Sequence, residues 1–271
     1  MTFTDYQSLP GVNWSSLKHM AKSPKHYLCE KAPPPYVTAA MVKGRAGHTA
    51  TLEPDLFASE YVVFPGSRRA GKDWDAFEAA NEGRTILKAN EAAAAWAMSK
   101  AVRAHPFAGP LLGGGEAEVS IQWVDPETGL ACKGRMDYLR PNALIDLKTS
   151  ADLDRRRFAA RALDLGHHGQ LAFYLRGLKA LGREPVETYL IAVEQSEPYD
   201  VGLFTVQEEE LEIGDSLVSE LLNRLAECEA TREWPGRYPG VERFYLPQHA
   251  YSETESGDMG LTITSSEGEA A

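Results

Sequence analysis

Hydrophobic and polar residues alternate in the middle of the chain in a way that predicts consecutive strands. Residues 116–124 (EAEVSIQWV) have the period of two that is typical of a strand. The turn sequence DPETG follows at 125–129, and two apolar-rich runs come next, separated by Pro141 and Asn142. We expect these three strands to form an antiparallel meander, with a further strand over 186–194.

The segments on either side of the meander are expected to be mostly helical. Serine can cap a helix and proline can open one, so the first helical segment should break at Ser23 and Pro24. One acidic amphipathic helix is expected beyond 206. The first segment spans 14–31, and the others are 38–52, 73–82, 89–104, 153–163 and 168–181. The pattern predicts a mixed α/β protein.

Composition indicates an ordinary globular protein with one domain over residues 1–250, whose N-terminal part is helical. Of the 271 residues, 43% are hydrophobic and 25% are charged. Residues 251–271 are rich in Ser, Thr, Gly and Glu and are expected to be a disordered acidic tail. The N-terminus has no signal-peptide pattern, and no run reaches the roughly 20 apolar residues that span a bilayer. We therefore expect a cytoplasmic protein with no membrane partner.

The three cysteines do not indicate a disulfide framework or a zinc site. Cys29, Cys132 and Cys228 lie far apart in the sequence and have no CxxC spacing. Free thiols are the expected state.

The net charge of −11 is concentrated toward the C-terminus. Residues 207–229 contain eight acidic residues and one arginine, whereas residues 1–206 are neutral overall. Phosphate contacts need only a few basic groups along a groove, so the charge does not exclude DNA as a partner. The Gly-rich loop 65–72 offers Arg68, Arg69 and Lys72 as candidate DNA contacts, and a solvated surface is the alternative.

The strongest chemical signal lies on the third strand of the meander. Side chains two positions apart share a face, so Asp146 and Lys148 lie side by side while Leu147 faces the other way. Charges beside an apolar strand are costly unless they are paired or bind a metal. In one interpretation, Asp137 and Asp146 bind a hard divalent cation while Lys148 orients or activates a water for attack on phosphorus. The alternative is an edge strand with an Asp–Lys pair on its solvent face.

Other polar residues are candidates for the same site. Glu118 on the first strand could reach it, and so could Glu116, which should share its face. His48 lies on a helix of small residues and is either a ligand or a histidine of the core or surface. Gln170 and Tyr174 lie four apart on one helical face, which suits packing as well as support of a phosphate site.

Taken in order, these residues resemble the motifs of a nuclease superfamily. The spacing Asp137-x8-Asp146-x-Lys148 resembles the PD-(D/E)xK signature. The wider series, over about residues 10–205, resembles the RecE-type (exonuclease VIII) branch, which is similar in site and purpose to phage lambda exonuclease. Its motifs here are Gly47-His48, Glu118, Gly134-Arg135-x-Asp137, Asp146-x-Lys148-Thr149 and Gln170-x3-Tyr174.

The resemblance implies a restriction-endonuclease-like core, with a central mixed sheet flanked by helices. It implies a Mg²⁺-dependent deoxyribonuclease that uses two metal ions, with Mn²⁺ able to replace Mg²⁺. The activity implied is 5′-to-3′ exonuclease action at double-stranded DNA ends, which leaves 3′ overhangs for a single-strand annealing protein of a phage or prophage system. Ring-forming relatives imply a homo-oligomer with a central channel.

The resemblance also assigns a role to each site residue. Asp137 and Asp146 would be the metal ligands, together with the carbonyl of Leu147, and Lys148 would position the attacking water. The other assignments are Glu118 and His48 at the second metal position, Gln170 and Tyr174 as support for the lysine and water, and Arg45 as a phosphate contact.

Two other functions stay open on the sequence. One is a Cas4-like or structure-specific endonuclease with the same core, although the iron–sulfur cluster of the Cas4 form needs four cysteines and this chain has three. The other is a catalytically silent module that binds DNA ends. Digestion of linear but not circular DNA would exclude the first, and metal-dependent nucleotide release would exclude the second.

Overall fold

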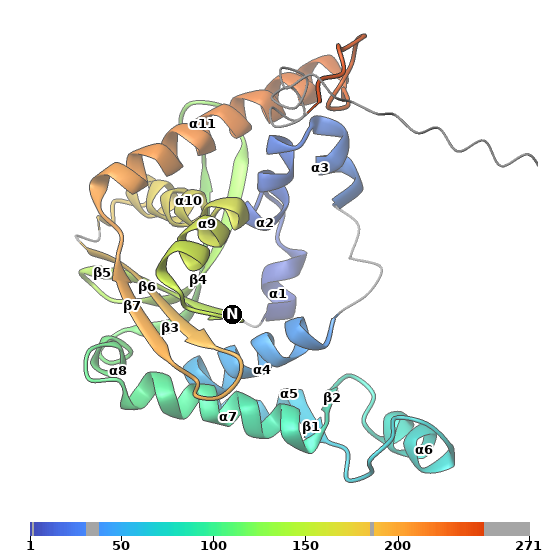
Figure 1. The fold of residues 1–271 in the computed structure, drawn as a ribbon. Coiled ribbons are helices and arrows are strands. Elements are labelled where there is room, and N and C mark those ends of the chain that lie inside the picture. Colours follow the sequence, from blue (N-terminus) through green and yellow to red (C-terminus); the bar gives the residue numbers. More distant parts are fainter. Residues whose placement is uncertain (2, 31–37, 185–186, 247–271) are drawn as a thin grey trace, which may run out of the picture. The chain divides into compact units, whose positions relative to one another are not determined.

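A five-stranded mixed sheet forms the centre of the protein (Figure 1). The computed structural model describes residues 1, 3–30, 38–184 and 187–246. The strands are Glu116–Val124 (β3), Ala131–Leu139 (β4), Ala143–Ser150 (β5), Glu187–Glu194 (β6) and Val201–Thr205 (β7). Their order in the sheet follows their order in the chain. The β5–β6 pair is parallel and the other neighbouring pairs are antiparallel. The predicted meander is therefore confirmed, and because β5 lies between β4 and β6, the edge-strand alternative is wrong.

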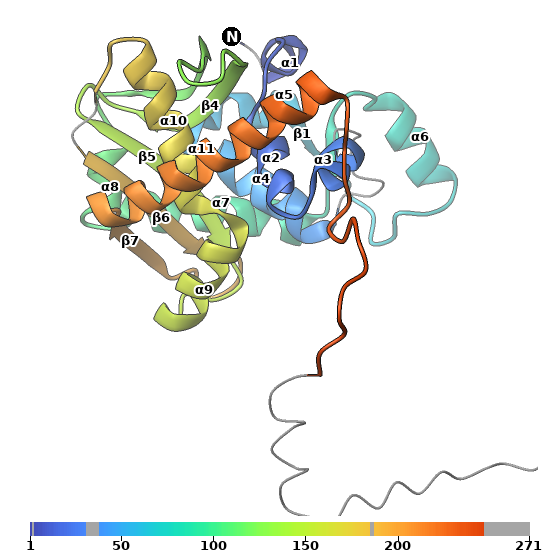
Figure 2. The same ribbon diagram turned by 90° about the horizontal axis from the view of Figure 1, so that it is seen from above.

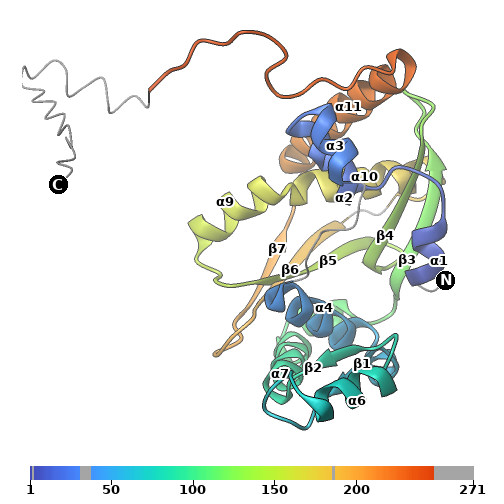
Figure 3. The ribbon, with the colours of Figure 1, turned by 90° about the vertical axis from the view of Figure 1, so that its right-hand side faces the viewer.

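Helices from the C-terminal half cover one face of the sheet (Figure 3). The parallel β5–β6 pair needs a crossover connection, which α9 (Arg155–Leu165) and α10 (His167–Ala180) provide. Gly166 separates these two helices with a left-handed φ of 72°, as glycine permits. The long helix α11 (Glu208–Thr231) lies over α10 (Figure 2). Buried side chains of the three layers, such as Met136, Phe173 and Leu221, form one continuous core.

Two helices from the N-terminal half cover the opposite face. These are α4 (Ala39–Leu52) and α7 (Ala89–Ala104), which lie below the sheet in Figure 3. Leu147 and Ile191 of the central strands pack there against Met98 of α7. Because both faces of β5 and β6 are covered, Ala143–Ile145 and Tyr189–Val193 are apolar runs, and the charges of Asp146 and Lys148 stand out in the buried part of β5.

The remaining elements are short. The parallel pair β1 (Tyr61–Val63) and β2 (Thr85–Leu87) was not predicted, because three-residue strands show no periodicity. Of the five strands of the main sheet, β7 was also not predicted, whereas the other four were. The other elements are α1 (Phe3–Ser8), α2 (Trp14–Leu17), η1 (Lys18–Ala21), α3 (Pro24–Glu30), η2 (Pro54–Leu56), α5 (Phe57–Glu60), α6 (Lys72–Ala80) and α8 (Ala108–Leu111). The predicted break at Pro24 is confirmed as the start of α3.

The chain divides into two units, Met1–Gly236 and Arg237–Ala271. The first unit contains all of the helices and strands named above. The acidic tail predicted over 251–271 lies outside the described residues. Among the helices of the described ranges, none is both long and apolar enough to cross a membrane.

Candidate active site

The candidate site lies where β4 separates from β5. In the ladder between these strands only Tyr138 and Leu139 of β4 are paired with β5. Farther along β4 the neighbouring position is taken by Val12, whose N–H donates to the carbonyl of Ala131 and whose carbonyl accepts from the N–H of Lys133. Among the described residues, no strand pairs with this part of β5 on its β4 side.

Side chains replace the missing strand at Leu147. The N–H and C=O of one strand residue point to the same side, so both groups of Leu147 need partners there. Its N–H donates to Oδ2 of Asp137 at 2.7 Å, and its carbonyl oxygen lies 3.0 Å from Nε2 of His48. A carbonyl can only accept, so Nε2 of His48 carries a proton. The main chain of Leu147 is therefore part of the site, and the role of its carbonyl as a metal ligand stays a prediction.

On β3 and β4, the regular alternation of side chains between the two faces of the sheet is broken at the site. On β3, Val119 packs in the core with α10, whereas Ala117, two positions earlier, packs in the core with α7. The same change of face occurs on β4 across Asp137, and the ladder between β3 and β4 is interrupted there, between the pairs Ala117–Tyr138 and Val119–Met136. Glu118 has a φ of 54°, a left-handed conformation that is uncommon for a residue other than glycine. Glu116 is exposed and lies outside the site, so its expected sharing of a face with Glu118 is wrong.

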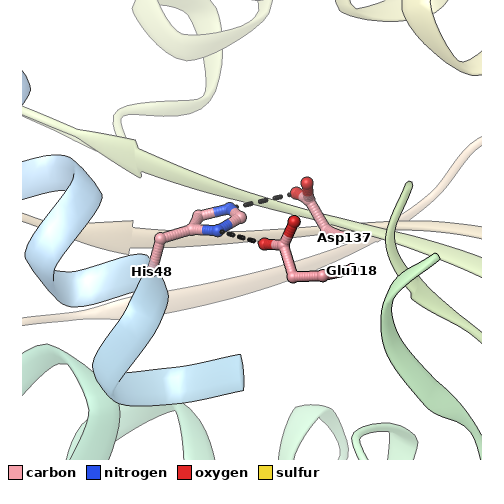
Figure 4. Close-up of side chains that lie close together, drawn as sticks. All are labelled: His48, Glu118 and Asp137. Carbon is pink, nitrogen blue, oxygen red and sulfur yellow. Dashed lines mark hydrogen bonds and ion pairs between the residues drawn. The ribbon is translucent and has the colours of Figure 1, made fainter. Parts of the chain in front are cut away.

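The break turns both carboxylates toward His48 of α4 (Figure 4). Nε2 of His48 lies 3.1 Å from Oδ2 of Asp137, and Nδ1 lies 3.4 Å from Oε1 of Glu118. One ligand atom from each of the three residues fits within 4.8 Å of the others. Close packing fixes the helix, because a Cβ on Gly47 would lie only 2.5 Å from Cε of Met98 on α7.

Asp146 and Lys148 form a buried ion pair outside this three-residue cluster. Nζ of Lys148 lies 2.6 Å from Oδ2 of Asp146, whose side chain is 1% exposed. The expectation that the two side chains share a face is therefore confirmed. Oδ1 of Asp146 is buried and has no hydrogen-bond partner among the described residues. Such an atom is costly unless another group, such as a cation, satisfies it.

The two aspartates have opposite electrostatic environments. Burial alone would raise the pKa of Asp137, but the positive charges of His48 and Lys148 lower it to about 2. Burial also raises the pKa of Asp146, and although Lys148 opposes this shift, the negative charge of Asp137 adds to it and the pKa rises to about 6. Two neighbouring carboxylates with separated pKa values are typical of a functional site.

The two basic side chains keep their protons in this arrangement. Burial would lower the pKa of His48, but Asp137 and Glu118 raise it well above the usual value. Burial would likewise lower the pKa of Lys148, but Asp146 and Asp137 raise it.

The donor set fits a hard divalent cation such as Mg²⁺. Carboxylate and carbonyl oxygens are the ligands that Mg²⁺ prefers, and imidazole is a common ligand of divalent transition metals such as Mn²⁺. The site offers carboxylates of Asp137, Glu118 and Asp146, the carbonyl of Leu147 and the imidazole of His48. Such a cation would give the buried Oδ1 of Asp146 the partner that it lacks among the described residues.

Gln170 and Tyr174 lie on α10, where Tyr174 is close enough to Asp137 and Asp146 to sense their charges. Nε2 of Gln170 donates to the hydroxyl of Tyr174 at 3.1 Å. Burial raises the pKa of Tyr174 well above its usual value, and the charges of Asp137 and Asp146 add to this shift. Tyr174 packs on Gly134 of β4, where an added Cβ would lie 2.9 Å from the ring.

The four predicted phosphate contacts lie on the surface. Arg45, on α4, and Arg68 and Lys72, in and after the loop 65–71, are exposed. Arg69 has partners within the protein: it donates to the carbonyl of Ile86 at 2.7 Å and forms an ion pair of 2.7 Å with Glu91. The contacts of Arg69 therefore tie this loop to β2 and α7.

Two further residues lie near the site, Arg135 and His167, and neither was assigned a role from the sequence. Nε of Arg135 lies 2.6 Å from Oε2 of Glu118. Its position two residues before Asp137 was a signal, because side chains at that spacing on a strand share a face. Burial lowers the pKa of His167 to about 3, and the charge of Lys148 contributes to the shift. The position of His167 in the sequence carries no comparable signal.

Comparison with known proteins agrees with this architecture. Residues 13–244 match the model of the family described as PDDEXK-like domain of unknown function (DUF3799). The crystal structure of a protein from Eubacterium rectale, provisionally named an exonuclease, superposes with a TM-score of 0.62 and 15% identity over 95% of this chain and 99% of that chain. This likeness shows the fold. The structure of SSO0001, with 22% identity over 46% of this chain and 53% of its own, has a TM-score of 0.28, too low to support an argument. Among curated proteins, none matches.

Proposed function

Because the chain belongs to the PDDEXK-like domain family, we propose that it is a divalent-metal-dependent deoxyribonuclease. Family membership and the mixed sheet confirm the predicted PD-(D/E)xK core. The observation that carries the proposal is the convergence of acids from β3, β4 and β5 beside the ammonium of Lys148. A buried carboxylate oxygen without a partner has no evident structural purpose, but it suits a cation site.

In the proposed mechanism the residues of this chain hold the metal and the water. Asp137, Glu118 and Asp146 would hold Mg²⁺ together with the carbonyl of Leu147, and His48 would join them once the ring nitrogen that binds has lost its proton. The cation would supply charge neutralisation at the scissile phosphate and would lower the pKa of a bound water. Nζ of Lys148, which Asp146 fixes at 2.6 Å, would donate a hydrogen bond to the attacking water and orient it.

We further propose that the enzyme is a 5′-to-3′ exonuclease that acts at double-stranded DNA ends. Support comes from the RecE-type motif series and from the name of the E. rectale protein, which has nearly the same length as this chain. The same resemblance supports a 3′ overhang as product, a single-strand annealing protein as partner, and a phage or prophage origin. Arg45, Arg68 and Lys72 are exposed and remain candidate contacts to DNA phosphates.

One experiment tests activity, polarity and substrate together. The full chain is incubated with Mg²⁺ and a duplex labelled at its 5′ or its 3′ end, with and without a 5′ phosphate, and with circular plasmid as a second substrate. We expect early release of the 5′ label, retention of the 3′ label and no loss of the circle. Nicking or linearisation of the circle would favour an endonuclease. Binding of duplex ends without nucleotide release would favour the catalytically silent module.

We also propose that the protein works as a homo-oligomeric ring. A ring with a central channel would keep the enzyme on its DNA between successive cleavages. Light scattering of the full chain at working concentration should give a mass that is a multiple of 29.8 kDa. A monomer under those conditions would contradict the ring.

A further inference from the structure

We propose that Arg135 is a positioning residue, which holds Glu118 with one oxygen turned toward the metal cluster. The inference rests on the proposed metal site. Arg135 touches none of the reacting atoms. Its role is to keep the strained Glu118 in place.

Arg135 and the cluster share the two oxygens of Glu118. Oε2 accepts from Nε of Arg135 at 2.6 Å, and Oε1 faces Nδ1 of His48 at 3.4 Å. The short charge-assisted bond fixes the plane of the carboxylate. With Oε2 held by Arg135, Oε1 of Glu118 stays available as a ligand atom of the cluster.

Arg135 is itself held in place. Its side chain is 9% exposed, and Nη1 donates to Oγ of Ser120 at 3.1 Å and to the carbonyl of Met1 at 3.2 Å. Ser120 lies directly opposite Arg135 in the register of β3 on β4. A planar guanidinium that is bonded on several sides has a defined orientation, which a lysine could not reproduce. The position of Glu118 therefore depends on a rigid partner.

Glu118 needs such a partner because its surroundings oppose its position. Its φ of 54° is unfavourable, and the carboxylate of Asp137 lies in the same cluster with the same charge. Glu53 is a third negative group nearby: burial raises its pKa, and the charge of Glu118 raises it further. Nη2 of Arg135 lies 3.9 Å from Oε2 of Glu53, so the guanidinium lies between two repelling carboxylates.

Lys133 provides a matched control on the same strand. It lies two positions before Arg135, and its Nζ donates to the carbonyls of Tyr6, Gln7 and Leu9 at 3.1, 3.0 and 2.6 Å. Both residues thus bind the N-terminal segment, but the contacts of Lys133 are to these carbonyls rather than to the cluster. A change at Lys133 should loosen that segment without moving Glu118.

The test measures Mn²⁺ binding to the full chain by titration calorimetry in the absence of DNA. Loss of a partner that orients a metal ligand typically weakens metal binding by about 10- to 100-fold, and we expect a loss in that range for Arg135→Gln. Lys133→Met should bind Mn²⁺ as the wild type does. Unchanged affinity in Arg135→Gln, or an equal loss in Lys133→Met, would overturn the inference.

A double-mutant cycle separates positioning from a general loosening of the fold. If Arg135 acts through Glu118, then Arg135→Gln should cause no further loss of affinity once Glu118→Gln is present. Additive losses would overturn the inference.

Failure of this inference differs from failure of the proposed function. Arg135-dependent Mn²⁺ binding without nucleotide release would support the positioning role and contradict the nuclease. An active nuclease whose metal affinity does not depend on Arg135 would support the proposed function and contradict the positioning role. A wild-type chain that binds no Mn²⁺ would overturn both.

Discussion

The two aspartates of the site should respond in opposite directions to the same substitution. In metal-free protein at pH 7.5, we expect Asp146→Asn to stabilise the fold and Asp137→Asn to destabilise it. Asparagine has nearly the shape of aspartate, so the main change in each variant is the loss of one negative charge. The opposite responses follow from the opposite pKa shifts of the two carboxyls.

The magnitudes follow from the linkage between pKa and stability. Each unit of pKa difference between the folded and unfolded states corresponds to about 1.36 kcal/mol. The pKa of Asp146 rises from 3.8 to about 6, so its ionised form costs the folded state roughly 3 kcal/mol above pH 6. The pKa of Asp137 falls from 3.8 to about 2, so its ionised form stabilises the folded state by roughly 2 kcal/mol above pH 4.

The pH dependence distinguishes the two effects. As the pH falls from 7.5 to 5, Asp146 becomes protonated in the folded state while it stays ionised in the unfolded chain, so its penalty decreases. The gain from Asp146→Asn should therefore decrease over this range. The contribution of Asp137 is present above 3.8 and is lost only as the pH falls toward about 2. The loss from Asp137→Asn should therefore be nearly constant between pH 7.5 and 5.

Urea unfolding in the presence of EDTA, followed by the fluorescence of the five tryptophans, measures both variants. Addition of Mn²⁺ at about 100 times its Kd should then stabilise the wild type by about 2.7 kcal/mol and Asp146→Asn by much less. If both variants lose stability in EDTA, or if the gain from Asp146→Asn does not change with pH, the electrostatic reasoning is refuted.

Three further predictions concern neighbouring residues. Lys148→Ala should lower the hydrolysis rate by about 10²- to 10⁴-fold, with Mn²⁺ and duplex binding retained in calorimetry, and loss of metal binding would contradict a role limited to the water. Gly134→Ala should lower the free energy of unfolding in urea by about 1–3 kcal/mol, because its Cβ would meet the ring of Tyr174 at 2.9 Å, and an unchanged midpoint would count against that contact. Burial lowers the pKa of His167 from 6.5 to about 3. Below pH 6.5 the unfolded chain therefore binds a proton at His167 that the folded protein does not bind, and the stability that is present above pH 6.5 is lost as the pH falls. His167→Gln should reduce this loss in urea titrations at pH 7.5 and 5, and an equal loss in both proteins would contradict the assignment.

Local patterns were sufficient to predict most of the fold. The alternation over 116–124 gave β3 with both of its ends, and the proline at 24 marked a helix start that the structure confirms. The period of two also placed Asp146 and Lys148 on one face. These predictions succeeded because each depends only on neighbours in the sequence.

The features that were missed depend on contacts between distant segments. The change of face at Glu118 requires both strands to distort together, and no pattern within β3 reveals it. Whether β4 stays beside β5 depends on Val12, which is more than 100 residues away in the chain. The bond from Arg135 to Glu118 likewise joins two strands, although their antiparallel register would have placed the pair within reach.

The hydrogen bonds at Leu147 explain why the residue between Asp146 and Lys148 need not be a leucine. Residue 147 contributes only its peptide groups to the acids and the imidazole, while its side chain fills the hydrophobic layer against α7. Valine or isoleucine could therefore stand between Asp146 and Lys148 with the same geometry. Proline could not, because it would remove the N–H that anchors Asp137. The middle residue of the D-x-K tripeptide can vary among apolar side chains of similar size, but it must keep its backbone N–H.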